Sequence, residues 1–231
     1  MQKMASLKTA TSEFIIEPAS SSHFSYAEEI CSHYVESAKQ RGTGIAKRTP
    51  EYVTEKMREG KAIIALHRDG RFGGFSYIET WSHGQYVANS GLIVNPEFRN
   101  KGLGAAVKGA IFELSKVKYP EAKIFGITTS MAVLKMNSDL GYKPVTFSEL
   151  SQDDQFWKGC NSCPNVDILT RNNRKMCLCT GMLYDPAQNG EKKFDIRQQA
   201  EKVSRWQRMK EFLLFKKFRT GNSENSQSAS Q

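Results

Sequence analysis

The segment that most constrains the fold lies at residues 90–106. Residues 90–94 form an apolar run that ends in an Asn-Pro turn, and residues 104–118 have the composition of a helix. Between them, Gly102 and Gly104 allow the backbone to approach a ligand closely. The helix that follows directs its free N–H groups and the positive end of its dipole at the same place. The segment therefore predicts a strand–loop–helix unit that holds phosphate groups.

The loop also carries two cations, Arg99 and Lys101, which suit a phosphate ligand. It lacks the Gly-Lys-Ser/Thr ending of a P-loop and the Gly-x-Gly-x-x-Gly pattern of dinucleotide-binding proteins. Arg-x-x-Gly-x-Gly after a Val-x-Pro strand end instead resembles the acetyl-CoA signature of the GNAT N-acetyltransferases. The alternative is an ordinary strand-to-helix turn with a solvated basic face. The resemblance implies that acetyl-CoA contacts Ile93, Val94, Arg99, Asn100, Lys101, Gly102, Leu103, Gly104 and Ala105.

The order of the predicted elements agrees with this resemblance. Strands are predicted at 14–18, 62–67, 72–81, 85–94, 124–129 and 143–147, and helices at 22–40, 49–59, 104–118 and 131–140. The order alone indicates an α/β protein with helices on both faces of a sheet. The resemblance implies the GNAT fold, with a mixed and mostly antiparallel central sheet, over residues 12–150.

The catalytic side chains that the resemblance implies are partly missing. Many members carry a glutamate base where this chain has Ala88-Asn89-Ser90-Gly91, so Glu79 and His83 are the candidates for the general base. His83 could equally be a solvated turn residue. The family's tyrosine acid aligns with Asn137, which can position a water or the leaving thiolate but cannot deliver a proton as tyrosine does. A backbone N–H at Ile93 or Val94 corresponds to the family's oxyanion donor.

The acceptor is expected to meet the segment that follows the first predicted helix. This segment holds three cations, Arg41, Lys47 and Arg48, which suit the binding of carboxylates. A solvated basic loop is the alternative.

A second resemblance narrows the expected acceptor. Residues 42–48, 156–160 and 177–180 resemble a small group of stand-alone bacterial GNAT proteins associated with arginine biosynthesis. It implies transfer of an acetyl group to a small acidic amino acid, with L-glutamate favoured. The alternatives are a protein or peptide amine as acceptor, or a non-catalytic module that binds CoA or nucleic acid.

A cysteine-rich segment is expected at residues 151–190. Cys160, Cys163, Cys177 and Cys179 have a spacing that suits a structural zinc site, and the segment has too few apolar residues for a core of its own. The alternatives are reduced thiols, some of them buried, and a redox pair.

The C-terminal part of the chain is expected to be a basic amphipathic helix at 191–220 and a disordered tail at 221–231. Residues 187–231 hold ten Lys/Arg and five Asp/Glu, so +5 of the net charge of +9 lies there. The charge therefore does not argue for nucleic acid. The helix could dock on the catalytic domain, form a homodimer or lie on an anionic membrane. The sequence shows neither a membrane span nor a secretory signal, so we expect a cytoplasmic protein.

Overall fold

The computed structural model describes residues 9–10, 13–41 and 48–188. The predicted helix at 191–220 and the tail at 221–231 lie outside the described residues. So do Lys47 and the side chain of Arg41. None of the described helices is long and apolar enough to cross a membrane.

The core of the fold is an eight-stranded sheet with the order β1-β2-β3-β4-β5-β6-β8-β7. Every neighbouring pair is antiparallel except β5 and β6, so the prediction of a mixed, mostly antiparallel sheet is confirmed. The strands are β1 (Thr9–Ala10), β2 (Phe14–Pro18), β3 (Ala62–His67), β4 (Phe72–Trp81), β5 (Tyr86–Val94), β6 (Lys123–Thr128), β7 (Lys143–Val145) and β8 (Thr180–Tyr184).

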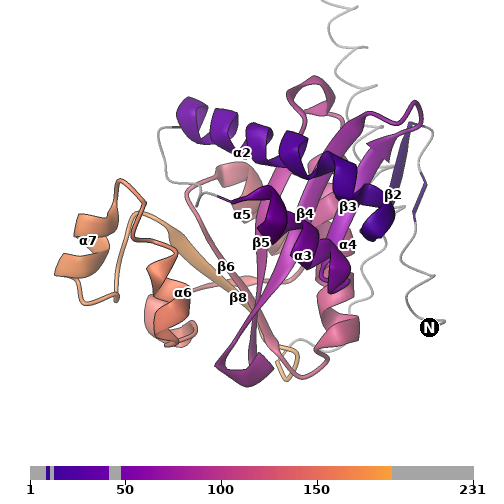
Figure 1. The fold of residues 1–231 in the computed structure, drawn as a ribbon. Coiled ribbons are helices and arrows are strands. Elements are labelled where there is room, and N and C mark those ends of the chain that lie inside the picture. The colour runs from indigo at the N-terminus through magenta and orange to yellow at the C-terminus, as the bar shows by residue number, and fades with distance from the viewer. Residues whose placement is uncertain (1–8, 11–12, 42–47, 189–231) are drawn as a thin grey trace, which may run out of the picture. The chain divides into compact units, whose positions relative to one another are not determined.

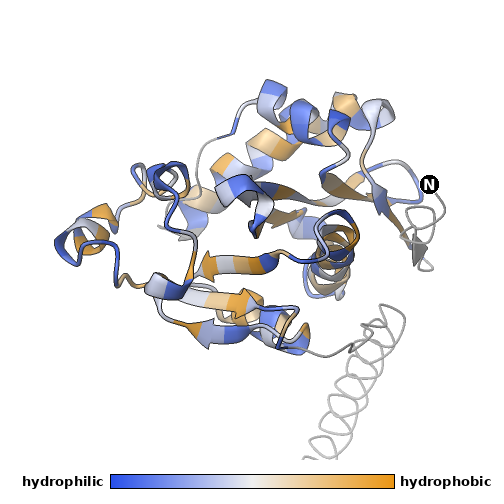
Figure 2. Cartoon of the chain, turned by 90° about the horizontal axis from the view of Figure 1, so that it is seen from below, coloured by the Kyte–Doolittle hydropathy of each residue, from blue (hydrophilic) through white to orange (hydrophobic). Residues whose placement is uncertain are grey.

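Helices cover both faces of this sheet (Figure 1). The α-helices are α2 (Ala27–Arg41), α3 (Pro50–Arg58), α4 (Leu103–Lys118), α5 (Met131–Asp139), α6 (Asp154–Lys158) and α7 (Val166–Arg171). Short 3-10 turns are η1 (Ser21–Tyr26), η2 (Ser82–Gly84), η3 (Pro96–Phe98) and η4 (Phe147–Glu149). Hydrophobic and hydrophilic bands alternate along the helices, as expected for helices with one side on a sheet (Figure 2).

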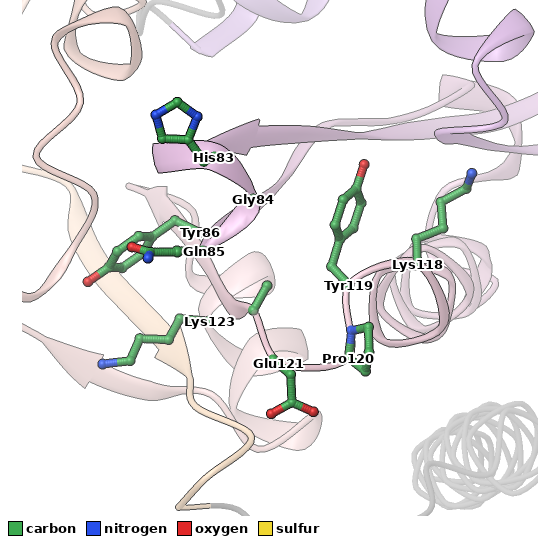
Figure 3. A pocket seen from close by; sticks show the side chains of 10 residues that line it. His83, Gly84, Gln85, Tyr86, Lys118, Tyr119, Pro120, Glu121 and Lys123 are labelled. Carbon is green, nitrogen blue, oxygen red and sulfur yellow. The ribbon is translucent and has the colours of Figure 1, made fainter.

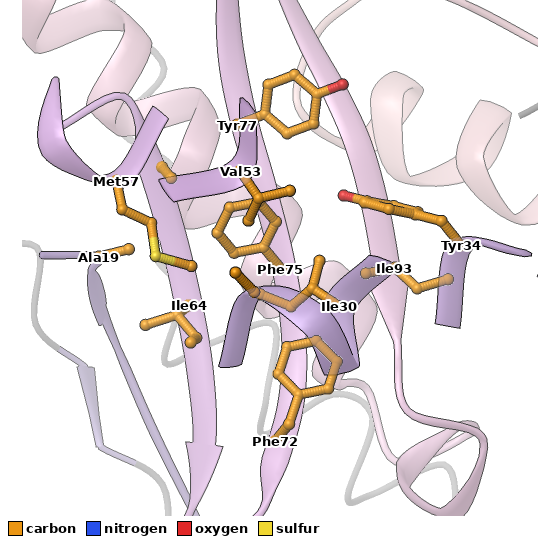
Figure 4. Packing of buried hydrophobic residues seen from close by; sticks show 12 residues of the cluster. Ala19, Ile30, Tyr34, Val53, Met57, Ile64, Phe72, Phe75, Tyr77 and Ile93 are labelled. Carbon is orange, nitrogen blue, oxygen red and sulfur yellow. The ribbon is translucent and has the colours of Figure 1, made fainter. Parts of the chain in front are cut away.

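The main core lies between the sheet and the pair α2 and α3. Ile30 of α2 and Met57 of α3 pack there against Phe75 of β4, and all three side chains are fully buried (Figure 4). A Cβ at Gly74, the residue before Phe75, would instead meet Val107 of α4 at 3.4 Å. Since successive residues of a strand point to opposite faces, α4 covers the face that α2 and α3 do not.

Local sequence signals explain where the elements begin and end. Thr49 accepts a hydrogen bond from the Tyr52 amide at 3.3 Å and Pro50 occupies the first turn of α3, which begins where the second helix was predicted. The last predicted strand is shorter than expected, since Thr146 begins the 3-10 turn η4 and its amide donates to Glu149 at 3.1 Å.

The cysteine-rich segment contributes a strand that the sequence analysis did not predict. β8 lies between β6 and β7 and pairs with both. Residues 146–179 therefore connect two neighbouring strands, β7 and β8, and they contain α6 and α7. A second cluster of buried residues joins this connection to the sheet, with Trp157 and Leu169 packed on the side of Ala88 and Phe125.

Candidate active site

The predicted phosphate loop leads directly into α4. Asn100 and Gly102 both adopt left-handed backbone conformations, with φ of 63° and 79°, and Gly102 is the N-cap of the helix. The first turn of α4 contains no acidic residue, so no carboxylate of the helix offsets its positive end. A Cβ on Gly104 would meet its nearest neighbour, Val94, at 3.5 Å, which is ordinary contact. Packing within the chain therefore does not require glycine at 104, and the absence of a side chain there leaves room for a ligand.

The two cations of the loop are held by weak contacts. Arg99 donates from Nε to the Val94 carbonyl at 3.3 Å and from Nη1 to Oε1 of Gln40 at 3.5 Å. Lys101 pairs with Glu13 at 3.4 Å, and both side chains are about half exposed. Exposed pairs of this kind contribute about 0 to 1 kcal/mol, so a phosphate group can displace them.

Strands β5 and β6 diverge close to this loop. They pair only at Tyr86–Lys123, Val87–Ile124 and Ala88–Phe125, and no strand pairing joins them from Asn89 onward. Within the described part of the chain, the edge of β5 that faces β6 thus has no strand neighbour over the residues that lead to Ile93 and Val94. An extended ligand with amide groups can pair with such an edge.

A bulge deforms β5 in the same region. The register passes from Tyr77–Ser90 to Phe75–Ile93, so β5 carries one residue more than β4. Gly91 within the bulge has a φ of 62°, and a Cβ there would lie 2.2 Å from Cε1 of Tyr77. Its carbonyl accepts a hydrogen bond from the Tyr34 hydroxyl at 2.5 Å. Position 91 therefore requires glycine.

Asn137 of α5 lies beside the point where β5 and β6 separate. Its Nδ2 is 3.9 Å from where a Cβ of Gly126 would stand, and Gly126 directly follows the last β6 residue paired with β5. The residue is 1% exposed, and its Oδ1 is buried without a hydrogen-bond partner among the described residues. A buried amide oxygen without a partner costs about 1 to 3 kcal/mol, which a ligand donor would offset.

A buried polar network that the sequence analysis missed lies on the α4 side of β5. Asn89 donates to Ser115 at 2.7 Å and accepts at Oδ1 from the Tyr142 hydroxyl at 2.8 Å. Lys108 of α4 contacts the same Oδ1 at 3.4 Å and lies over the Tyr142 ring. Burial lowers the pKa of Lys108 to about 7. The sequence feature that could have indicated this network is the position of Lys108 within the apolar part of the predicted helix at 104–118.

The structure brings Arg48 and Glu79 together. Nη2 of Arg48 lies 3.5 Å from Oε1 of Glu79, and Nε donates to the Tyr77 hydroxyl at 2.5 Å. Tyr52 donates to the same Glu79 oxygen, and the Arg48 guanidinium lies over the rings of both tyrosines. Burial and the Glu79 carboxylate raise the pKa of Tyr52. We call Arg48, Tyr52, Tyr77 and Glu79 the arginine–glutamate cluster. Its two tyrosines were not among the site residues predicted from the sequence.

His83 occupies a different environment from Glu79. It is an exposed residue of η2, where Ser82, His83 and Gly84 all have positive φ. It lines a shallow cavity of about 610 Å³ together with Lys118 and Lys123, at the end of α4 opposite the glycine loop (Figure 3). The structure does not bring His83 together with the arginine–glutamate cluster.

The four cysteines of the predicted zinc set line one cavity of about 20 Å³. All are free thiols, and burial together with the neighbouring cysteines raises the pKa of Cys160 to about 11 and that of Cys179 to about 12. As placed, no group of three or more His, Cys, Asp or Glu in the described ranges could hold a metal ion.

Comparison with solved structures establishes the fold. No protein family and no curated protein matches the sequence. The structure is similar to N-acetylglutamate synthase from Neisseria gonorrhoeae, complexed with coenzyme A and N-acetyl-glutamate (TM-score 0.54, 16% identity, 77% of this chain). It is also similar to a GNAT superfamily phosphinothricin acetyltransferase from Sinorhizobium meliloti in complex with acetyl-CoA (0.52, 14%, 77% of this chain and 92% of the other). A third is Rv2747 from Mycobacterium tuberculosis, in complex with CoA and NLQ (0.51, 13%, 74% and 98%).

The chain spans 36% of the length of the Neisseria synthase. At these identities the likeness defines the fold, and the chain has the fold of the GNAT acetyltransferases.

Proposed function

We propose that the protein is an N-acetyltransferase that uses acetyl-CoA. The observation that carries this proposal is the N-terminus of α4, which has no acidic residue in its first turn and begins at a left-handed glycine. This anion site directly follows β5, the strand that separates from β6. Pyrophosphate would bind at residues 99–105 and the pantetheine arm would extend along the free edge of β5. Similar structures that contain CoA or acetyl-CoA support this assignment.

The acceptor in this proposal is a small acidic amino acid, with L-glutamate favoured. Arg48 presents a planar guanidinium that matches a carboxylate, and Glu79 presents an anion that attracts an ammonium group. An amino acid carries both charges, so its zwitterion can replace the Arg48–Glu79 contact group for group. The N-acetyl-glutamate bound in the Neisseria structure supports this choice of acceptor. The resemblance of residues 42–48, 156–160 and 177–180 to GNAT proteins associated with arginine biosynthesis supports the same acceptor.

The chemistry requires loss of a proton from the amine, attack on the thioester carbon and departure of the CoA thiolate. Glu79 is the base of this proposal, since its carboxylate lies in the cluster that would bind the amine. A backbone N–H at Ile93 or Val94 stabilises the oxyanion. Asn137 positions the sulfur or a water beside it, and solvent protonates the thiolate.

A non-catalytic CoA-binding module is the second candidate, because Asn137 stands where the family carries a tyrosine acid. Release of free thiol from acetyl-CoA, measured with L-glutamate, other amino acids and N-terminal peptides, separates the candidates. We expect turnover with L-glutamate and loss of that turnover when Glu79 becomes Gln. CoA binding without turnover on any amine would support the module, and turnover on peptides alone would support a protein acceptor.

A further inference from the structure

At residues 176–179 the chain turns its thiols inward and its apolar side chains outward. Met176 and Leu178 are 60% and 63% exposed, whereas Cys177 and Cys179 are half-buried and line the 20 Å³ cavity. The alternating exposure and the shared cavity place both thiols on the same side of the chain. Burial of methionine and leucine would stabilise the fold more than burial of two cysteines. The orientation therefore favours a function for the sulfur atoms.

The other two thiols reach the same cavity from a separate part of the segment. Cys160 follows α6, and the Cys163 amide donates to the Cys160 carbonyl at 2.9 Å, so a tight turn brings the pair together. Cys160 and Cys163 thus come from the middle of the connection between β7 and β8, before α7, and the other two come from its C-terminal end, after α7.

Few contacts hold residues 164–176, which lie between these two pairs. Their helix α7 contains six residues, which is too short for stability without tertiary contacts. The helix buries only Leu169. A cross-link at the cavity would fix both ends of this segment at one point.

We propose that Cys160, Cys163, Cys177 and Cys179 bind one Zn²⁺ ion in a closed structural site. Four thiolates and tetrahedral geometry are the ligand set that zinc prefers. The four sulfur atoms are not arranged around a common centre in this structure. Zinc binding would therefore move each of them to about 2.3 Å from the ion. This movement breaks the contact between the Cys177 thiol and the Asn165 carbonyl at 3.8 Å. Each thiol loses its proton to solvent as the zinc–sulfur bonds form.

The ion would stabilise a surface that adjoins the arginine–glutamate cluster. Helix α6, which leads into Cys160, contacts the end of β4 through Phe156, whose ring centroid is 5.7 Å from that of Trp81, and its N-cap Asp153 accepts from the Ser82 amide at 3.3 Å. Trp81 lies two residues beyond Glu79 on the same strand face. This inference does not depend on the proposed acetyl transfer.

The test is metal analysis of the full chain, purified in reducing buffer without chelators. We expect one zinc ion per chain in the wild type and in Cys31→Ser, which alters a cysteine of α2 outside the cavity. We expect substoichiometric zinc in Cys160→Ser and Cys177→Ser, and a lower Tm after chelation only in the proteins that hold zinc.

Cobalt substitution of the wild type gives a second readout that needs no variant, since four thiolates around Co²⁺ produce strong thiolate-to-metal charge-transfer absorption. Wild-type protein that binds no zinc even after zinc is added would overturn the proposal. So would full zinc content in Cys177→Ser, cobalt spectra without thiolate bands, or an intact mass that shows disulfides in place of metal.

Discussion

Replacement of Lys108 by methionine should stabilise the protein, and more strongly at pH 7 than at higher pH. Burial lowers the pKa of Lys108 from 10.5 to about 7. At about 1.36 kcal/mol for each pKa unit, a lysine at this position lowers the free energy of unfolding at pH 7 by about 4 kcal/mol. Methionine has a similar volume and loses the weak contact with Asn89 at 3.4 Å and the position of the amine over the Tyr142 ring, together worth about 1 kcal/mol, while Tyr142 still donates to the Asn89 oxygen. The expected net gain is about 3 kcal/mol.

The pH dependence tests this argument. Between about pH 7 and 10.5 the unfolded chain holds the proton and the folded protein releases it, so wild-type stability rises with pH in this window. Urea unfolding of both proteins from pH 7 to 9 should show the advantage of Lys108→Met shrinking by about 1.36 kcal/mol per pH unit. Lys116→Met, a partly exposed lysine on the same helix, is the control and should show no such trend. An advantage that is constant over this range, or a destabilised variant at pH 7, would refute the reasoning.

Three further substitutions test the candidate site. Gly91→Ala should lower the free energy of unfolding, measured in urea, by about 3 kcal/mol or more, because the new Cβ would lie 2.2 Å from the Tyr77 ring. The control Gly70→Ala, at a residue with a φ of 90° and open space around it, should lower it by about 1 kcal/mol. Gly104→Glu should raise the KM for acetyl-CoA at least about tenfold while the Tm is retained, whereas equal KM values would contradict a phosphate site at α4. Arg48→Lys should raise the KM for L-glutamate about tenfold and leave that for acetyl-CoA unchanged, as steady-state kinetics would show.

The order and approximate bounds of the elements from β2 to β7 could be predicted from the sequence. Apolar periodicity and strong local signals define them, such as the Thr49–Pro50 helix start and the glycine-containing loop before α4. The signals are local, so they need no knowledge of the neighbours that each element will have.

The features that could not be predicted from the sequence share a physical cause, since each depends on contacts between residues that are distant along the chain. β8 has no recognisable period of its own and becomes a strand because two edges, those of β6 and β7, pair with it. Tyr52 joined the candidate site only because α3 brings it to Glu79, 27 residues along the chain. The burial of Lys108 depends likewise on Asn89 and Tyr142, which come from other elements.

The insertion of β8 between β6 and β7 has a consequence for how the chain folds during synthesis. β7 has β8 as its only strand partner among the described residues, so it cannot join the sheet until residues 180–184 have left the ribosome. Until then β6 presents an open, apolar edge to other chains, which is an aggregation hazard. A fragment that ends at residue 150 would keep this edge open permanently. The cysteine-rich connection is therefore part of the shortest piece of this chain that we expect to fold as a soluble unit.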